Sequence, residues 1–535
     1  MKTIEERIKA SHVRRAWEKI GIRHHHGINV ALFSIHSKQS CGIGEFLDLK
    51  LLIDFCSLVS FGVIQLLPLN DSGFETSPYN AVSSQALNPI YLSLYDLPFV
   101  QNDRELKEKL TEFTTPLRKI NYHETLTAKL AFLTTYYKKY FDRFEKTNPY
   151  LLFLEQHPWV YDYGLFKTLK DQYHHKGWFS WEKKHQDMTH TYKKQLFHER
   201  SFEIHFYIFL QFLSFTQLEE VKRYAGHKGI LIKGDIPILI SPESLDVWSG
   251  RENFDLDYCA GSPPDIFTPK GQNWGFPIYN WSHMEETHYS FWQDRLKTAS
   301  LFYHMFRIDH IIGLYRIYAI PRKSRNNKGS FIPNSPPLAL MQGERILEKL
   351  TSYTPMLPIG EDLGVDIEYI RKSLSNQAIP GIIIPRWERD HFGDHSFTPY
   401  SEYNPFSLTT VSTHDSETLS QWWKNNTEEV RHFCEGHGLI YQEELTHKLR
   451  YQMLKDSHMS ASLFHINLLS EYLALFDDLV WKDPKDERIN QPGTVLPTNW
   501  CYRMKPSLET LLDHSSLKLQ MISLLKNEKG AFLEK

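Results

Sequence analysis

Short runs of apolar residues recur along this chain, and several of them end in charged or polar side chains. Near-continuous Ile, Leu and Val character is typical of strands that are buried on both faces of a parallel sheet. Helix-like stretches follow several of the runs. The pattern predicts an α/β protein, a (β/α)8 TIM barrel, in one catalytic domain over residues 1–535. The candidate strands are residues 28–35, 63–69, 230–238, 306–311, 356–362, 381–387, 408–415 and 494–500.

The candidate strands are unevenly spaced, and three long intervals between them are predicted insertions. Residues 100–220 are rich in Lys, Glu, Tyr, Phe and Leu and poor in Gly and Pro, so we expect a mainly helical insertion subdomain there. Residues 322–350 begin with Asn, Lys, Gly, Ser and Pro, which indicates a loop insertion above the fourth strand. Residues 418–485 show a helical pattern and are expected to form a helical cover over the barrel mouth.

Three candidate strands end in carboxylates, namely Asp309, Glu361 and Asp415. The strand ends of a (β/α)8 barrel point into one mouth, so these side chains would meet although they are far apart along the chain. Glycosidic cleavage with retention uses two carboxylates about 5–5.5 Å apart, one as nucleophile and one as general acid/base. A lone strand-end carboxylate is as well explained by helix capping or by pairing with an arginine. Three of them, together with Arg307, favour a sugar-cleaving site.

Composition limits the partners that we expect. The net charge of −3 and the pI near 6.8 give no electrostatic reason to expect nucleic acid or another polyanion, so a neutral substrate is favoured. No apolar run approaches the ~18 residues of a membrane span, and the first residues lack the apolar segment of a secretory signal. The five cysteines form no C-x-x-C pair, which is typical of reduced thiols and predicts a cytoplasmic protein.

Histidines gather at positions 24–26 and 174–175. Adjacent histidines do not easily converge on one tetrahedral ion, and no nearby Cys or carboxylate spacing supports a metal site. We therefore interpret these histidines as surface residues. No metal ion and no organic cofactor are expected.

Further motifs accompany these strand ends in a fixed order. Together they resemble the signature of glycoside hydrolase family 77, the 4-α-glucanotransferases (amylomaltases or disproportionating enzymes). Each motif is weak alone, but the ordered set covers nearly the whole chain. The motifs are Gly42-Ile43-Gly44, Gln65-Leu66-Leu67-Pro68-Leu69, Ser77-Pro78-Tyr79, Leu87-Asn88-Pro89, Lys233-Gly234-Asp235-Ile236-Pro237-Ile238, Pro263-Pro264-Asp265, Gly271-Gln272-Asn273-Trp274-Gly275-Phe276-Pro277, Tyr279-Asn280-Trp281, Asn490-Gln491-Pro492-Gly493-Thr494 and Asn499-Trp500.

The resemblance implies a role for each carboxylate. Asp309 corresponds to the nucleophile that forms a covalent β-glucosyl intermediate, and Arg307 lies on the same side of the predicted strand. Glu361 corresponds to the general acid/base, whose pKa must rise for it to give and take a proton. Asp362 is the competing candidate for that role. Neighbouring strand residues face opposite ways, so only one of the two can serve, and the motif favours Glu361.

The resemblance also implies sugar contacts on both sides of the cleaved bond. Asp415 and His414 correspond to the pair that holds ring hydroxyls at the donor subsite. Asp235 and Tyr79 match further donor positions, with the Tyr79 ring as a platform under the sugar.

On the acceptor side, Gln272 and Trp274 lie where the family builds its acceptor subsites, and Trp387 is a further candidate for sugar contact. The segment Gly275-Phe276-Pro277 resembles the branch that contains the plant cytosolic disproportionating enzyme. That likeness implies a branched glucan such as glycogen among the acceptors.

The predicted reaction is transfer of a segment of an α-1,4-glucan, such as maltose or a maltodextrin, to the 4-hydroxyl of another glucan or of glucose. A retaining double displacement would carry it through a covalent glucosyl-enzyme intermediate. Because water competes for that intermediate, the enzyme must pre-position the acceptor, an advantage worth up to ~7–11 kcal/mol. Two alternatives remain open at this point. One is a retaining, amylase-like α-glucan hydrolase, and the other is a catalytically inactive glucan-binding protein.

Overall fold

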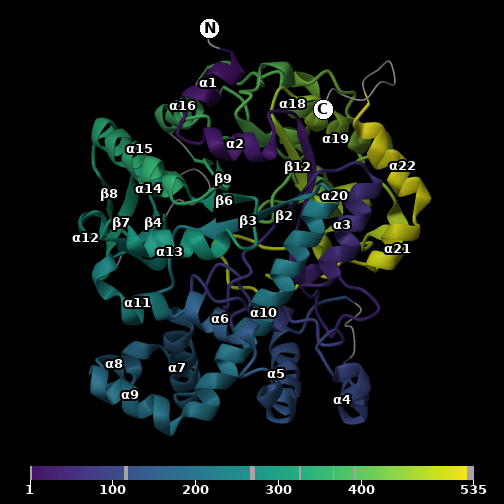
Figure 1. The fold of residues 1–535 in the computed structure, drawn as a ribbon. Helices are drawn as coiled ribbons and strands as arrows, with labels where there is room; N and C mark the ends of the chain where they lie inside the picture. Colours follow the sequence, from purple (N-terminus) through teal and green to yellow (C-terminus); the bar gives the residue numbers. More distant parts are fainter. Residues whose placement is uncertain are drawn as a thin grey trace.

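A sheet of eight parallel strands forms the centre of the molecule in the computed structural model (Figure 1). The structure describes residues 3–113, 118–264, 271–324, 327–364, 367–390 and 393–526. The strand order is β10-β11-β12-β1-β2-β3-β6-β9. The strands are β1 (His25–Val30), β2 (Val63–Leu66), β3 (Leu231–Pro237), β6 (Met305–Asp309), β9 (Leu357–Gly360), β10 (Gly381–Ile383), β11 (Ser407–Thr409) and β12 (Phe464–Leu468).

This sheet closes on itself, which confirms the predicted (β/α)8 barrel. The backbone N–H of Gly360, at the end of β9, donates to the carbonyl of Pro380, just before β10, at 2.8 Å. Between β1 and β2, a Cβ atom at Gly27 would lie 2.3 Å from the carbonyl oxygen of Val63, so only glycine allows this close approach.

Seven of the predicted strands overlap barrel strands, but the eighth prediction is wrong. Residues 494–496 have no regular secondary structure and residues 497–500 form a turn. The eighth strand is β12, inside the segment 418–485 that was expected to be helical. The strand reads Phe-His-Ile-Asn-Leu, and its two polar residues concealed it. Both are fully buried because they find partners: His465 bonds to the carbonyl of Ser457 at 2.8 Å, and Asn467 donates to the Tyr472 hydroxyl at 2.9 Å.

A second, antiparallel sheet flanks the barrel and was not predicted. Its order is β5-β4-β7-β8. Part of it occupies residues 322–350, the expected loop insertion, which instead carries β8 and most of helix α15. The prolines at 336 and 337 suggested a loop, but they stand in the first turn of α15. Backbone N–H groups in a first turn have no partner within the helix, so proline, which has no N–H, is tolerated there. The elements are β4 (Phe254–Ser262), β5 (Gln272–Tyr279), β7 (Ile317–Pro321), β8 (Ser330–Ile332) and α15 (Pro336–Ser352).

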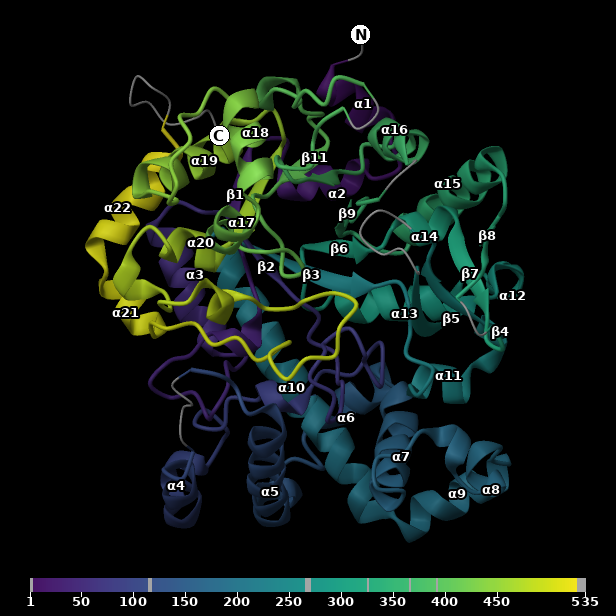
Figure 2. The ribbon, with the colours of Figure 1, turned by 180° about the vertical axis from the view of Figure 1, so that it is seen from behind.

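Helices between β2 and β3 extend from one end of the molecule, and α10 runs from them back to the barrel (Figures 1 and 2). Helices α7 and α10 pack closely because Gly164 leaves room for the Ile204 carbonyl, which would lie 2.7 Å from a Cβ atom. The helices are α4 (Arg104–Leu110), α5 (Tyr122–Tyr140), α6 (Asn148–Gln156), α7 (Trp159–Gln172), α8 (Lys183–Gln186), α9 (His190–Glu199) and α10 (Ser201–His227).

The remaining helices cover the barrel or connect its strands. None of the helices in the described ranges is both long and apolar enough to cross a lipid bilayer. They are α1 (Ile4–Ala10), α2 (Arg14–Ile20), α3 (Asp48–Leu58), α11 (Leu245–Ser249), α12 (Trp281–Glu286), α13 (Ser290–Ala299), α14 (Ile312–Tyr315), α16 (Glu368–Asn376), α17 (Leu419–Asn425), α18 (Thr427–Gly436), α19 (His447–Met459), α20 (Leu469–Leu473), α21 (Leu508–Asp513) and α22 (Ser515–Leu524).

The histidines at 24–26 lie at the start of β1, with His24 just before the strand, and they belong to a packed cluster, so the surface interpretation is wrong for them. His24 Nδ1 is 3.1 Å from His465 Nε2, and His26 Nδ1 is 2.9 Å from His458 Nδ1. Burial lowers the pKa of His25 to about 4. Burial and neighbouring imidazoles also hold the pKa values of His26, His458 and His465 well below 6.5.

This cluster makes the fold sensitive to acid. As the pH falls from 6.5 toward 4, histidines in the unfolded chain take up protons, whereas those in the folded cluster stay neutral. The folded state is therefore fully stable with respect to these groups above pH 6.5 and loses stability as the pH falls toward 4. Each histidine kept neutral changes the free energy of unfolding by about 1.4 kcal/mol per pH unit in that window. We expect His458→Gln to weaken the pH dependence by about this amount, measured by urea unfolding on either side of pH 6.5.

The control for this experiment is His174→Gln, because His174 is exposed, as the sequence predicted. The control should keep the wild-type pH dependence. Parallel curves for His458→Gln and wild type would contradict the account.

Candidate active site

The polar residues predicted from strand ends meet at the carboxyl-terminal end of the barrel, where the active sites of this architecture lie. Asp235 is on β3, Arg307 and Asp309 are on β6, and Glu361 directly follows β9. Asp415 stands on a loop that follows β11. Because the strands that carry or precede these residues are neighbours in the barrel or face one another across it, residues from four segments of the sequence share one site.

The buried guanidinium of Arg307 is the centre of this group. Its Nη1 atom is 2.7 Å from Asp309 Oδ1 and 2.9 Å from Asp235 Oδ2. Arg307 and Asp309 are two residues apart on β6, so both side chains point to the same side. Burial opposes the positive charge, but Asp235 and Asp309 outweigh it and hold the pKa of Arg307 well above its usual value. One fixed cation thereby orients two carboxylates in the mouth.

Glu361 is held by backbone amides at the next strand end. Its Oε2 atom accepts from the N–H of His310 at 2.8 Å, and its Oε1 atom accepts from the N–H of Leu363 at 3.2 Å. Burial raises the pKa of Glu361 to about 7; Arg307 opposes this shift and Asp309 adds to it. A carboxyl that titrates near neutrality is suited to both giving and taking a proton.

Asp362, the competing candidate, faces away from this group. Its Oδ1 atom accepts from the N–H of Ile382 at 2.7 Å, and its Oδ2 atom lies 3.6 Å from the Arg371 guanidinium. It therefore ties the end of β9 to the start of β10 and has a structural explanation.

Asp415 is fixed from two sides. Asn490 donates to its Oδ1 atom at 2.6 Å, and His414 Nε2 lies 3.3 Å from its Oδ2 atom. Burial acts to raise the pKa of Asp415, but His414 and Asn490 overcome it and hold that pKa well below the usual range. Asp415 is thus an ionised acceptor at the rim of the site.

Tyr79 connects the two halves of the site. Its hydroxyl donates to Asp235 Oδ2 at 2.7 Å and lies 2.9 Å from His414 Nε2, from which it accepts. A continuous network therefore runs from Asp309 through Arg307, Asp235, Tyr79 and His414 to Asp415. The Tyr79 ring stacks on the His414 ring with centroids 5.4 Å apart.

Asn490 and Trp500 belong to this site but were assigned no role from the sequence. The Trp500 ring lies 5.6 Å from that of Tyr79 and 6.0 Å from that of His414. Both residues fall within the ordered motifs near the end of the chain. The wrong assignment of residues 494–500 to a barrel strand hid the proximity of Trp500 to Tyr79 and His414.

Of the three acceptor-side candidates, two lie together on β5. Trp274 Nε1 donates to Gln272 Oε1 at 3.1 Å, and the Trp274 ring meets the ring of His310 edge-on at 5.0 Å. Since His310 follows Asp309, this contact brings β5 to the edge of the carboxylate group. Trp387 follows β10 and is 39% exposed, with the Arg386 guanidinium 5.3 Å from its ring.

Within the described part of the chain, no group of three His, Cys, Asp or Glu side chains is arranged to hold a metal ion.

Comparison with known proteins agrees with this geometry. Residues 30–509 match a family model described as 4-alpha-glucanotransferase. Two proteins of that name, from Chlamydia pneumoniae and Chlamydia muridarum, are 45% and 41% identical over 95% and 97% of this chain and over 96% and 98% of their own lengths. The solved structure of an amylomaltase from Streptococcus agalactiae in complex with acarbose matches with a TM-score of 0.81 at 25% identity, covering 94% of this chain and 98% of that one. The predicted resemblance is confirmed: the chain belongs to glycoside hydrolase family 77, the 4-alpha-glucanotransferases.

Proposed function

We propose that this enzyme breaks an α-1,4 bond of a maltodextrin, keeps the donor segment covalently on Asp309, and passes it to the 4-hydroxyl of another glucan or of glucose. The observation that carries the proposal is the arrangement around Arg307. One guanidinium orients Asp309, while Glu361, with a pKa of about 7, titrates beside it. A nucleophilic carboxylate and a separate acid/base are the two parts that a retaining double displacement needs.

In the first step, Asp309 attacks the anomeric carbon and a C–O bond to the enzyme forms. The bond to the leaving glucan breaks as Glu361 donates its proton to the departing oxygen, so no charge is left on that oxygen. In the second step, Glu361 takes the proton of the acceptor hydroxyl, and that oxygen displaces Asp309. Two inversions at the same carbon retain the α-configuration.

Asp415, His414, Asp235 and Tyr79 would hold the donor sugar while its ring flattens. Asp415 is an ionised acceptor, so it can bind neighbouring ring hydroxyls through charge-assisted hydrogen bonds. Contacts that strengthen as the ring flattens lower the barrier more than contacts to the relaxed sugar. The stacked rings of Tyr79 and His414 offer the sugar an apolar surface.

Transfer, rather than hydrolysis, requires that a sugar hydroxyl reach the intermediate ahead of water. Gln272 and Trp274 support an acceptor site because Trp274 packs against His310, the neighbour of Asp309. An indole face binds the C–H face of a pyranose, and pre-positioning of this kind can offset the abundance of water.

We further propose that the substrates are neutral glucans such as maltose, maltodextrins and glycogen, without nucleic acid or membrane partners. The net charge of −3 supports this. All five cysteines are free and buried, which supports a reducing compartment such as the cytoplasm.

Products from maltotriose test the reaction class. We expect both shorter and longer oligosaccharides to form while the number of reducing ends stays nearly constant, because each cleavage is matched by a new bond. Chromatography with a reducing-end assay measures both quantities, and adding glycogen tests a branched acceptor. A rise in reducing ends equal to the number of bonds cleaved would mean hydrolysis instead.

Replacing the nucleophile tests the assignment of Asp309. Asp309→Asn should lower kcat/KM for maltotriose by about 10³-fold or more, because the amide cannot form the covalent intermediate. Asp362→Asn is the matched control, since Asp362 faces away from the site. We expect the control to keep most of its activity; a comparable loss in both variants would contradict the assignment.

The pH dependence tests the assignment of Glu361. Because the first step needs the protonated acid, kcat/KM for maltotriose should fall as the pH rises through about 7. The Glu361→Gln variant should still react with maltosyl fluoride, a donor whose leaving group needs no proton. The rate of that reaction should not fall as the pH rises through this range. A Glu361→Gln variant that keeps the wild-type pH profile with maltotriose would disprove the role.

A further inference from the structure

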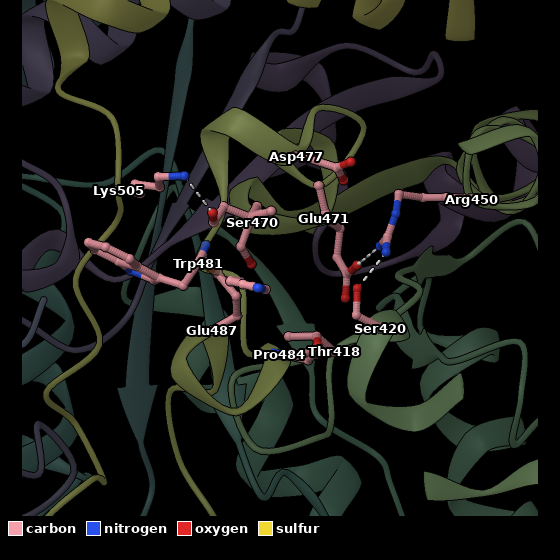
Figure 3. A pocket seen from close by; sticks show the side chains of 13 residues that line it. Thr418, Ser420, Arg450, Ser470, Glu471, Asp477, Trp481, Pro484, Glu487 and Lys505 are labelled. Atoms are coloured by element: carbon pink, nitrogen blue, oxygen red, sulfur yellow. Dashed lines mark hydrogen bonds and ion pairs between the residues drawn. The ribbon is translucent and has the colours of Figure 1, made fainter. Parts of the chain in front are cut away.

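A cavity of about 440 Å³ is lined in part by the end of the loop that carries His414 and Asp415 and by the helix that follows it (Figure 3). Thr418, at the end of this loop, and Ser420, in the first turn of α17, line the cavity. Arg450 of α19 and Glu471 of α20 also line the cavity, and their side chains point toward each other in Figure 3. None of these four residues has a role in the reaction proposed above.

Glu471 joins the two ends of the loop. Its Oε1 atom accepts from the hydroxyl of Ser412 at 2.6 Å and from the backbone N–H of Leu419 at 2.8 Å. Ser412 precedes His414 and Asp415, and Leu419 follows them. A single carboxylate oxygen therefore closes the base of the loop on which Asp415 stands.

Arg450 completes this clamp. Its Nη1 atom lies 3.2 Å from Glu471 Oε2, and its Nη2 atom donates to the hydroxyl of Ser420, the residue after Leu419 (Figure 3). Glu471 is 1% exposed and Arg450 is 5% exposed. A buried ion pair of this kind gives its hydrogen bonds a fixed direction, which a solvated carboxylate would not.

The middle of the loop, which includes His414 and Asp415, is held by residues other than Glu471 and Arg450. Asn490 donates its side-chain amide to Asp415 at 2.6 Å and its backbone N–H to the carbonyl of His414 at 3.1 Å. Arg386 donates to the carbonyl of Glu417 at 3.0 Å. These contacts fix the middle of the loop relative to neighbouring segments, whereas Glu471 bonds both to the residue at its entry and to the residue at its exit.

We propose that Glu471 is a positioning residue for transglycosylation, which acts by holding the loop so that Asp415 meets the donor sugar in the transition state. The inference rests on the proposed role of Asp415. A displacement of about 1 Å at a reacting group can cost about 10²-fold in rate. Since Asp415 acts on the flattened sugar, its displacement lowers kcat while KM changes little.

The first experiment compares Glu471→Ala with Glu471→Gln by maltotriose kinetics. Alanine removes the shared acceptor, and we expect kcat to fall about 10- to 100-fold with KM within about twofold. Glutamine keeps one oxygen that Ser412 and Leu419 can share, so it should recover a large part of that loss. Both variants lose the charge that pairs with Arg450, so their melting temperatures should fall by similar amounts.

Asp477→Asn is the matched control, because Asp477 lines the same cavity but is exposed. It should keep kcat within about twofold of wild type. The Glu471 variants are expected to fold, because water that enters the cavity can solvate Arg450. The kinetics of each variant are measured well below its melting temperature. Lower melting temperatures with unchanged kcat in both Glu471 variants would show a purely structural role and overturn the proposal.

A double mutant tests whether Glu471 acts through Asp415. In an Asp415→Asn background, Glu471→Ala should change kcat by less than about twofold, because the group that it positions is already disabled. The full 10- to 100-fold loss in that background would overturn the proposal. If Asp415→Asn alone has wild-type activity, the proposed role of Asp415 fails, and this inference fails with it. If Asp415→Asn loses activity but the Glu471 variants do not, the role of Asp415 stands and only the inference on Glu471 fails.

Discussion

The shared guanidinium of Arg307 is the interaction on which the site depends. Asp235 and Asp309 both lie within hydrogen-bonding distance of its Nη1 atom, and Asp235 is almost completely buried. Removing one partner from a buried ion pair costs about 3–5 kcal/mol, because the remaining charge loses its counter-ion without regaining water. Arg307 therefore makes it possible to hold two carboxylates in one enclosed mouth and to keep Asp309, the proposed nucleophile, in a fixed direction.

The barrel supplies the geometry that this interaction needs. Arg307 and Asp309 share a face of β6 because side chains alternate along a strand, and on β3 the same rule places Lys233 below Asp235. Lys233 is fully buried and donates to Gln65 Oε1 at 2.7 Å, and burial holds its pKa well below the usual value. Polar side chains thus continue from the mouth into the barrel, each with a partner.

The sequence predicted those parts of the molecule that follow a local rule. Apolar strands, the carboxylates at their ends and the family motifs are all local, and they led to the barrel and to the group around Arg307. Contacts between distant residues were missed. The polar residues of β12 are buried with partners that Ser457 and Tyr472 supply, and Asn490 joins the site through Asp415 and the carbonyl of His414. The packing of histidines across β1 and β12 is another such contact, which no spacing in the sequence reveals.

The central claim is that Asp309 becomes covalently bound to the donor sugar. It is tested most directly by mass spectrometry of the Glu361→Gln variant, quenched during reaction with maltosyl fluoride and digested to peptides. This variant should form the intermediate and release it slowly, because Glu361 is no longer present to activate the acceptor. The account predicts a maltosyl adduct on the peptide that contains Asp309, at that residue. An adduct on another residue, or turnover with no adduct at all, would contradict it.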